Sequence, residues 1–74
     1  MNSEEIRKQI GRNIAEARRE AGLSQAKLAM RLALASQEIS RLECGRRSVP
    51  GLTTLLRVAH ALEVPLADLL QGIE

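Results

Sequence analysis

The chain has 74 residues, of which 45% are hydrophobic and 27% are charged, and its formal net charge is +2 at pH 7. A single domain of this length buries only about 60% of the surface that its unfolded chain exposes, so an enclosed active site has little room. Phe, Tyr and Trp are all absent. The core must therefore be aliphatic, and the composition disfavours the aromatic stacking platforms that bind single-stranded nucleic acid.

Cysteine and histidine each occur once, as Cys44 and His60. They can form neither an intramolecular disulfide nor a four-ligand zinc site. The sequence has no glycine-rich phosphate loop, no nucleophile with a base in range and no paired-carboxylate motif, so it predicts no enzyme and no cofactor. No apolar run approaches the roughly 18 residues that span a bilayer. We expect a cytoplasmic protein with no membrane contact.

Apolar residues recur with helical spacing, and nothing alternates with the period of a strand. The first predicted helix begins near a capping box of Asn2 and Glu5 and ends at Gly22, which favours the left-handed conformation. Its apolar face comprises Ile6, Ile10, Ile14, Ala17 and Ala21. Ser24 is a suitable N-cap for a second helix through Leu32, whose inward side chains are Leu28, Ala29 and Leu32.

Three further helices follow in the second half of the chain. The segment 36–43 places Ile39, Leu42 and Glu43 on one side and only polar side chains on the other: Ser36, Gln37, Ser40 and Arg41. After the loop "GRRSVPG", a fourth helix over 52–62 is expected to turn Leu52, Leu55, Leu56, Ala59 and Leu62 inward. Pro65 then opens a fifth helix over "PLADLL" at its first helical position, where proline is tolerated. These segments predict one all-α domain over 1–74.

Glu43 lies on the inward face of the third predicted helix, where an unpartnered carboxylate would be unfavourable. The best cationic candidate is Arg18, which follows Ile14 by one turn of the first helix and is next to the inward Ala17. We therefore predict a partly buried Arg18–Glu43 pair that joins the first helix to the third. The alternative is two separately solvated charges.

Positive charge is concentrated in the middle of the chain. Residues 24–57 carry six basic and two acidic side chains, a net charge of +4, whereas residues 58–74 carry no basic and three acidic ones. On the polar face of the third helix, Gln37 can bind adenine and Arg41 guanine through two hydrogen bonds each, and Ser36 and Ser40 can bind bases or phosphates. Cations that could contact phosphate lie before this face and after it: Lys27, Arg31, Arg46 and Arg47. A solvated polar surface is the alternative explanation.

Two stretches resemble a known family. They are "IGRNIAEARREAGLSQAKLAMRLALASQEISRLECGRR", from residue 10 to residue 47, and "LTTLLRVAHALEVPLADLL", from 52 to 70. Together they resemble the Xre/Cro-like helix-turn-helix family, which includes the phage lambda-type repressors. The most specific parts of the likeness are "GLSQ", "ISRLE" with a glycine two residues later, and "ALEVPLADLL".

The resemblance implies a compact five-helix, lambda-repressor-like DNA-binding domain with its helix-turn-helix at about residues 24–43. It further implies that Gln25, first in the second helix, touches DNA phosphate. The helix from Ser36 corresponds to the recognition helix in the major groove, which gives a base-reading role to Ser36, Gln37, Ser40 and Arg41. Family members also pair an arginine with a glutamate at the Arg18 and Glu43 positions.

The turn between the second and third helices departs from the family pattern. Family members usually have glycine at the Ala33 position and a capping residue at the Ala35 position, and this chain has alanine at both. An alanine in left-handed geometry is unfavourable by about 1 kcal/mol. Either Ala33 is strained or the turn has another geometry.

The sequence thus predicts a sequence-specific regulator that binds double-stranded DNA as a homodimer on a palindromic operator, with half-sites about 34 Å apart. We expect the dimer interface in residues 58–74, through Val58, Leu66, Leu69, Leu70 and Ile73. The alternative is an antitoxin or another protein-interaction module, with a protein partner, in which DNA binding is secondary.

Overall fold

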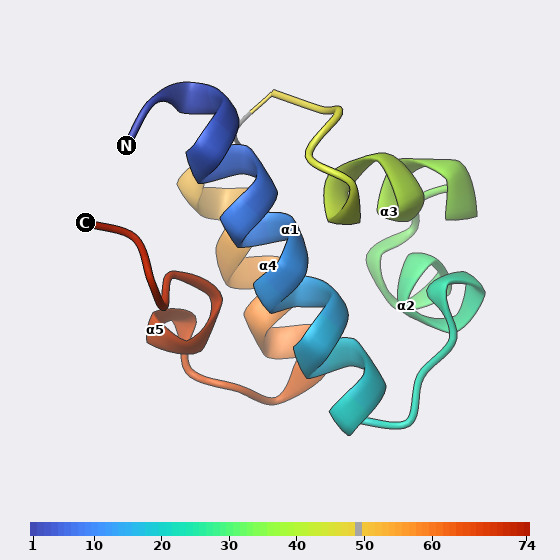
Figure 1. The fold of residues 1–74 in the computed structure, drawn as a ribbon. Coiled ribbons are helices and arrows are strands. Elements are labelled where there is room, and N and C mark those ends of the chain that lie inside the picture. Colours follow the sequence, from blue (N-terminus) through green and yellow to red (C-terminus); the bar gives the residue numbers. More distant parts are fainter. Residues whose placement is uncertain (49) are drawn as a thin grey trace.

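The computed structural model describes residues 1–48 and 50–74, and within these ranges it contains helices and no strands. The helices are α1 (Ser3–Glu20), α2 (Gln25–Leu32), α3 (Ser36–Glu43), α4 (Leu52–Leu62) and α5 (Leu66–Leu69). The long α1 packs against α3, α4 and α5, while α2 packs against α3 and α4 (Figure 1). The all-α, five-helix prediction is confirmed. The predicted "GRRSVPG" loop includes residue 49, which lies outside the described residues.

The predicted caps of the first two helices are confirmed. Asn2 and Glu5 form a reciprocal capping box, with the Glu5 N–H donating to Asn2 Oδ1 at 2.8 Å and the Asn2 N–H donating to Glu5 Oε1 at 3.1 Å. Gly22 has a φ of 73°, in the left-handed region. The Lys27 N–H donates to Ser24 Oγ at 3.0 Å. Local sequence signals therefore set where α1 ends and α2 begins.

The core takes one fully buried side chain from each helix: Ile14, Leu28, Ile39, Val58 and Leu69. All five are aliphatic, as the absence of aromatic residues requires. Since burial of such a side chain contributes about 1.5 to 3 kcal/mol, this shared cluster holds even the four-residue α5 in place.

The rotation of α4 differs from the prediction. Leu52 and Leu56 were expected to point inward, but they are 64% and 48% exposed, and Val58 is buried instead. The buried stripe of this helix is Leu55, Val58, Ala59 and Leu62. Val58 and Leu69 were also expected in a dimer interface. That expectation is wrong, because both are fully buried in the core of the single chain.

The last helix begins one residue later than predicted. Pro65 is the N-cap of α5 and not its first helical residue. Asn13 of α1 holds the far end of the helix, since its Nδ2 donates to the carbonyl oxygens of Leu69 and Gln71, both at 2.9 Å. These bonds fix α5 against α1.

The turn between α2 and α3 keeps the left-handed geometry although it has no glycine. Ala33 has φ 56° and ψ 40°, and the N–H of Leu34 donates to the Ala29 carbonyl at 2.8 Å. Ala35 is the N-cap of α3 and makes no side-chain hydrogen bond to it. Of the two alternatives for this turn, the structure therefore has the strained one.

The substitution Ala33→Gly is expected to raise the free energy of unfolding by about 0.5 to 1 kcal/mol, because it removes left-handed strain and adds only the entropy of a glycine. Ala26→Gly is a suitable control, since Ala26 is exposed within α2. Glycine at this helical position should lower the free energy of unfolding by about 1 kcal/mol. Urea denaturation followed by circular dichroism measures both changes. Destabilisation by Ala33→Gly would contradict the prediction.

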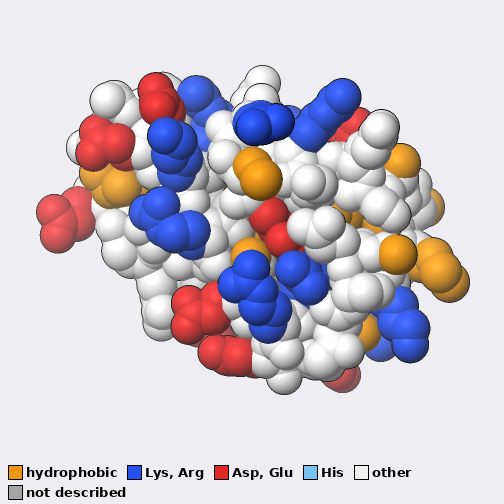
Figure 2. All heavy atoms as spheres, turned by 45° about the vertical axis from the view of Figure 1, so that its right-hand side comes forward, with side chains coloured by type: hydrophobic (Ala, Val, Ile, Leu, Met, Phe, Trp, Pro, Cys, Tyr) orange, Lys and Arg blue, Asp and Glu red, His pale blue; other side chains and the backbone are white. Residues whose placement is uncertain are grey.

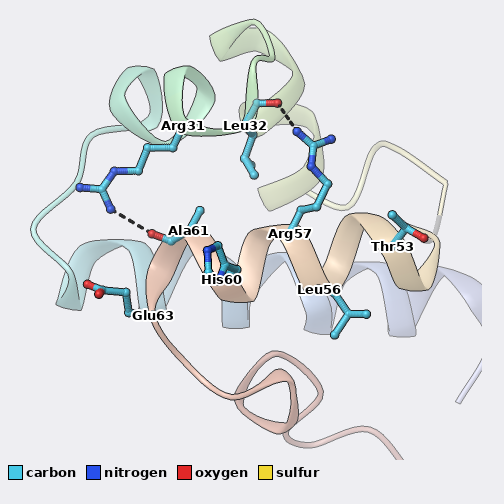
Figure 3. Close-up of a pocket in the computed structure, with 8 residues that line it drawn as sticks. All are labelled: Arg31, Leu32, Thr53, Leu56, Arg57, His60, Ala61 and Glu63. Carbon is cyan, nitrogen blue, oxygen red and sulfur yellow. Dashed lines mark hydrogen bonds between the residues drawn. The ribbon is translucent and has the colours of Figure 1, made fainter.

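Two arginines join α2 to α4, and Figure 3 shows each reaching toward the other helix. Arg57 Nη2 donates to the Leu32 carbonyl oxygen at 2.8 Å, and Arg31 Nη1 donates to the Ala61 carbonyl oxygen at 2.9 Å. Each guanidinium thus binds the carboxyl end of the other helix, where unpaired carbonyls favour a cation. The end of α2, from which the turn leaves, is therefore fixed by α4.

Candidate nucleic-acid interface

Close contact with α1 positions the carboxyl-terminal half of α3. Gly11 is buried at this contact, and a β-carbon there would lie 2.6 Å from the Leu42 carbonyl oxygen and also overlap the Glu43 carbonyl. Ile39 and Leu42 are buried on the same side of α3. Backbone thus packs directly on backbone at this point.

The charged pair predicted between Arg18 and Glu43 is present at the centre of the site. Arg18 Nε donates to Glu43 Oε2 at 2.6 Å and Nη2 donates to Oε1 at 3.1 Å, and the two side chains are only 11% and 6% exposed. The hydrogen bonds from Arg18 to this carboxylate raise the pKa of the guanidinium, against the opposing effect of burial. Arg18 Nη1 also donates to the Leu23 carbonyl at 2.8 Å. The pair is bidentate, which fixes its geometry.

Gln25, at the amino end of α2, is attached to the same pair. Its Nε2 donates to Glu43 Oε1 at 3.0 Å. The carboxylate of Glu43 therefore links three helices: α1 through Arg18, the start of α2 through Gln25, and α3 itself. This network sets the position of α3 relative to the first turn of α2.

The opposite side of α3 faces solvent. Ser36, Gln37 and Arg41 are exposed, and Ser40 is half-buried. Lys27 on α2 and Arg46 after α3 are also exposed, while Arg47 is half-buried. Figure 2 shows Lys and Arg side chains distributed over the face that brings α2 and α3 forward, with acidic side chains between them. Hydrogen-bonding groups of the outer α3 face are thus available to a ligand.

Arg31 is placed differently from the other predicted phosphate contacts. Its guanidinium binds the end of α4 and lines a groove between α2 and α4 together with Arg57 and His60 (Figure 3). Its place is thus set by the bond to α4, and its contact with DNA phosphate stays a prediction. The physical reason is the affinity of a cation for the carboxyl end of a helix.

Sequence reasoning missed three charged residues near α3. Glu38 lies between two cations, with Oε1 at 3.8 Å from Arg41 Nη1 and Oε2 at 3.3 Å from Arg47 Nη1. The Glu38–Arg41 spacing of three residues was a detectable signal. Arg12 and Arg19 of α1 line a second groove, shared with Gln25 and with Cys44. Nothing local in the sequence assigns them there, because only the packing of α1 on α3 creates this groove.

A helix-turn-helix domain model matches residues 11–74. The chain belongs to the helix-turn-helix domain family. The Xre/Cro-like resemblance and the five-helix, lambda-repressor-like fold are thereby confirmed. The protein is a DNA-binding transcriptional regulator of the helix-turn-helix type and not an enzyme.

Similar proteins agree with this assignment. An uncharacterized HTH-type transcriptional regulator, y4dJ of Sinorhizobium fredii, is 42% identical over 65 residues, which cover 88% of this chain and 83% of that protein. The restriction-modification controller protein C.AhdI of Aeromonas hydrophila superposes with a TM-score of 0.77 at 32% identity, over 84% of this chain and 92% of its own. The clp gene regulator ClgR of C. glutamicum gives a TM-score of 0.83 at 27% identity, over 93% and 96% of the two chains.

Two further features bear on other functions. Within the described ranges, no group of three or more His, Cys, Asp or Glu side chains is arranged to hold a metal ion. Of the helices in those ranges, none combines the length and the hydropathy that crossing a bilayer requires.

Proposed function

We propose that this regulator binds a palindromic operator as a homodimer and inserts α3 into the major groove. The observation that carries the proposal is the division of α3 into two sides. Ile39, Leu42 and Glu43 anchor its inner side, while the outer side presents only polar side chains. The proposed base-reading residues are Ser36, Gln37, Ser40 and Arg41. A rigidly held helix with an outward amide and an outward guanidinium suits direct reading of base edges.

The proposed phosphate contacts lie on either side of α3. Gln25 is the first residue of α2, and Ser24 caps the N–H of Lys27. The backbone N–H groups of Gln25 and Ala26 have no partner within the helix and can bind a phosphate. Lys27, Arg46 and Arg47 provide positive charge around them. Such contacts position a protein on the duplex without reading its sequence.

The proposed dimer contact lies in the carboxyl-terminal third, without Val58 and Leu69. Leu70 is exposed, Leu66 and Ile73 are half-buried, and α4, which packs against α5, exposes Leu52 and Leu56. Leu52, Leu56 and Leu70 leave apolar area exposed, and Leu66 and Ile73, which pack against the core, leave part of their area uncovered. A dimer is needed because one module of this size buries too little DNA surface for tight specific binding.

Binding-site selection from random duplex DNA at moderate salt tests the base-reading assignment. Wild type should enrich an inverted repeat, and Arg41→Ala and Gln37→Ala should each relax the preference at one position, by about 1 to 3 kcal/mol for a lost bidentate contact. Arg46→Ala is the matched control. It should weaken binding to all sequences by the same factor. It should also reduce the slope of log affinity against log salt concentration by about one, the equivalent of one phosphate contact.

Two results would contradict the proposal. Wild type could fail to enrich any sequence, or both α3 variants could enrich the wild-type motif unchanged. Sedimentation velocity tests the dimer separately. If the protein is a monomer in free solution and also binds the selected duplex as a monomer, the homodimer is contradicted, while the proposed role of α3 still stands.

A further inference from the structure

Glu38 is placed unusually for a residue of a DNA-facing helix. It is the one carboxylate on the outer part of α3, since Glu43 points inward to Arg18. Its two oxygens are shared between two cations of the proposed interface: Oε1 faces Arg41 at 3.8 Å and Oε2 faces Arg47 at 3.3 Å. A negative charge is thus held where phosphates and electronegative groove edges would approach.

The two cations are held to different degrees. The Nη1 atom of Arg47 is buried, and among the described residues it has no hydrogen-bond partner of good geometry. The Glu38 carboxylate at 3.3 Å therefore compensates its charge. Arg41 is 60% exposed and 3.8 Å away, so it is oriented by the carboxylate but remains free to reach a base. Glu38 thus holds Arg47, which follows α3, in place, and orients the side chain of Arg41 on α3.

We propose that Glu38 is a specificity-determining residue of the DNA interface, which positions Arg41 and Arg47 and weakens binding to incorrect sequences. This inference rests on the proposed base-reading role of α3. A specific interface commonly contains a repulsive element that penalises the wrong partner more than the right one. Glu38 supplies that element within the reading helix itself.

The chemistry of the major groove explains the discrimination. Guanine presents two acceptors there and thymine presents one, and each repels a carboxylate, whereas the amino groups of cytosine and adenine donate to it. A duplex with the right base beneath Glu38 therefore offsets the repulsion with a hydrogen bond. Every base pair carries one amino donor in the major groove, so the discrimination depends on whether that donor or an acceptor lies within reach of Glu38. Where an acceptor lies there, the charge of the carboxylate reduces the net attraction to the duplex.

The test compares Glu38→Gln with Glu20→Gln. Both substitutions remove one negative charge, but Glu20 is exposed at the end of α1 and lines a groove on the α5 side of that helix. Fluorescence anisotropy gives dissociation constants for the selected duplex and for a scrambled duplex of equal composition, at about 100 and 300 mM salt. Circular dichroism melting checks that each variant is folded.

Glu38→Gln should tighten binding to the scrambled duplex by about three- to tenfold and binding to the selected duplex much less, so that the specificity ratio falls. Glu20→Gln should change both constants by the same factor, below about twofold, because salt screens a remote charge. Glu38→Asp keeps the charge and should keep the weak binding to the scrambled duplex. This second variant separates repulsion from loss of fold.

If Glu38→Gln changes both constants by one common factor, as Glu20→Gln does, the inference is overturned. The base-reading role would then still stand on the Arg41→Ala and Gln37→Ala selections. If wild type selects no sequence at all, the proposed function itself fails. The two failures are therefore distinguishable.

Discussion

Replacing Arg18 by Met is expected to lower the free energy of unfolding by about 3 to 5 kcal/mol, because it leaves the buried Glu43 carboxylate without its counter-ion. Only the 3.0 Å hydrogen bond from Gln25 would remain on that carboxylate. A domain of 74 residues has a total stability of about 4 to 11 kcal/mol. The substitution therefore removes a large part of it, and urea denaturation followed by circular dichroism should show a much lower midpoint.

The double variant Arg18→Met, Glu43→Leu is the control for this prediction. Replacing both members of a buried ion pair by apolar side chains is often neutral or stabilising, so most of the lost stability should return. The Leu23 carbonyl still loses its bond from Arg18, which limits the recovery. An unchanged midpoint for the single variant would show that Glu43 tolerates the loss of its counter-ion, and would contradict the prediction.

The substitution Gly11→Ala should also destabilise the protein, by about 1 to 3 kcal/mol, although alanine is the better helix former. The added β-carbon would meet the backbone carbonyls of Leu42 and Glu43, which cannot rotate away as a side chain can. The end of α3 must then move away from α1. Thermal denaturation measures the loss, and binding to the selected duplex should weaken in the folded fraction because α3 has shifted.

Glu16→Ala is a matched control for Gly11→Ala, because it adds alanine to an exposed position of the same helix. It should change stability by less than about 0.5 kcal/mol. If Gly11→Ala were instead stabilising, by the helix propensity of alanine alone, the close approach of α1 and α3 would be absent in solution.

The bounds of α2, α3 and α4 could be predicted, because each is an amphipathic segment. Ser24 marks the start of α2 and Gly51 precedes α4, whereas the turn before α3 has neither a glycine nor a polar residue. The Arg18–Glu43 pair was predictable for a similar reason: a carboxylate on an inward face needs a cation, and few cations are one turn from a core residue. The outward face of α3 followed from the same periodicity.

The rotation of α4 could not be predicted. This helix has apolar residues on several sides, including Leu52, Leu56 and Val58, so its periodicity does not determine which of them the core will take. The structural role of Arg31 depends on where α4 ends in space, which no local pattern contains. The place of Glu38 between two arginines likewise depends on the path of the chain after α3.

The exchange of arginines between α2 and α4 has a mechanical consequence. Because Arg31 and Arg57 each bind the carboxyl end of the other helix, relative sliding of α2 and α4 would break both bonds together. We therefore expect α2 and α4 to move as one rigid unit under a force. The exposed leucines of α4 lie on one part of this unit, and the turn into α3 lies on another. In the proposed complex, a contact that tilted α4 would therefore change the angle at which α3 meets the duplex.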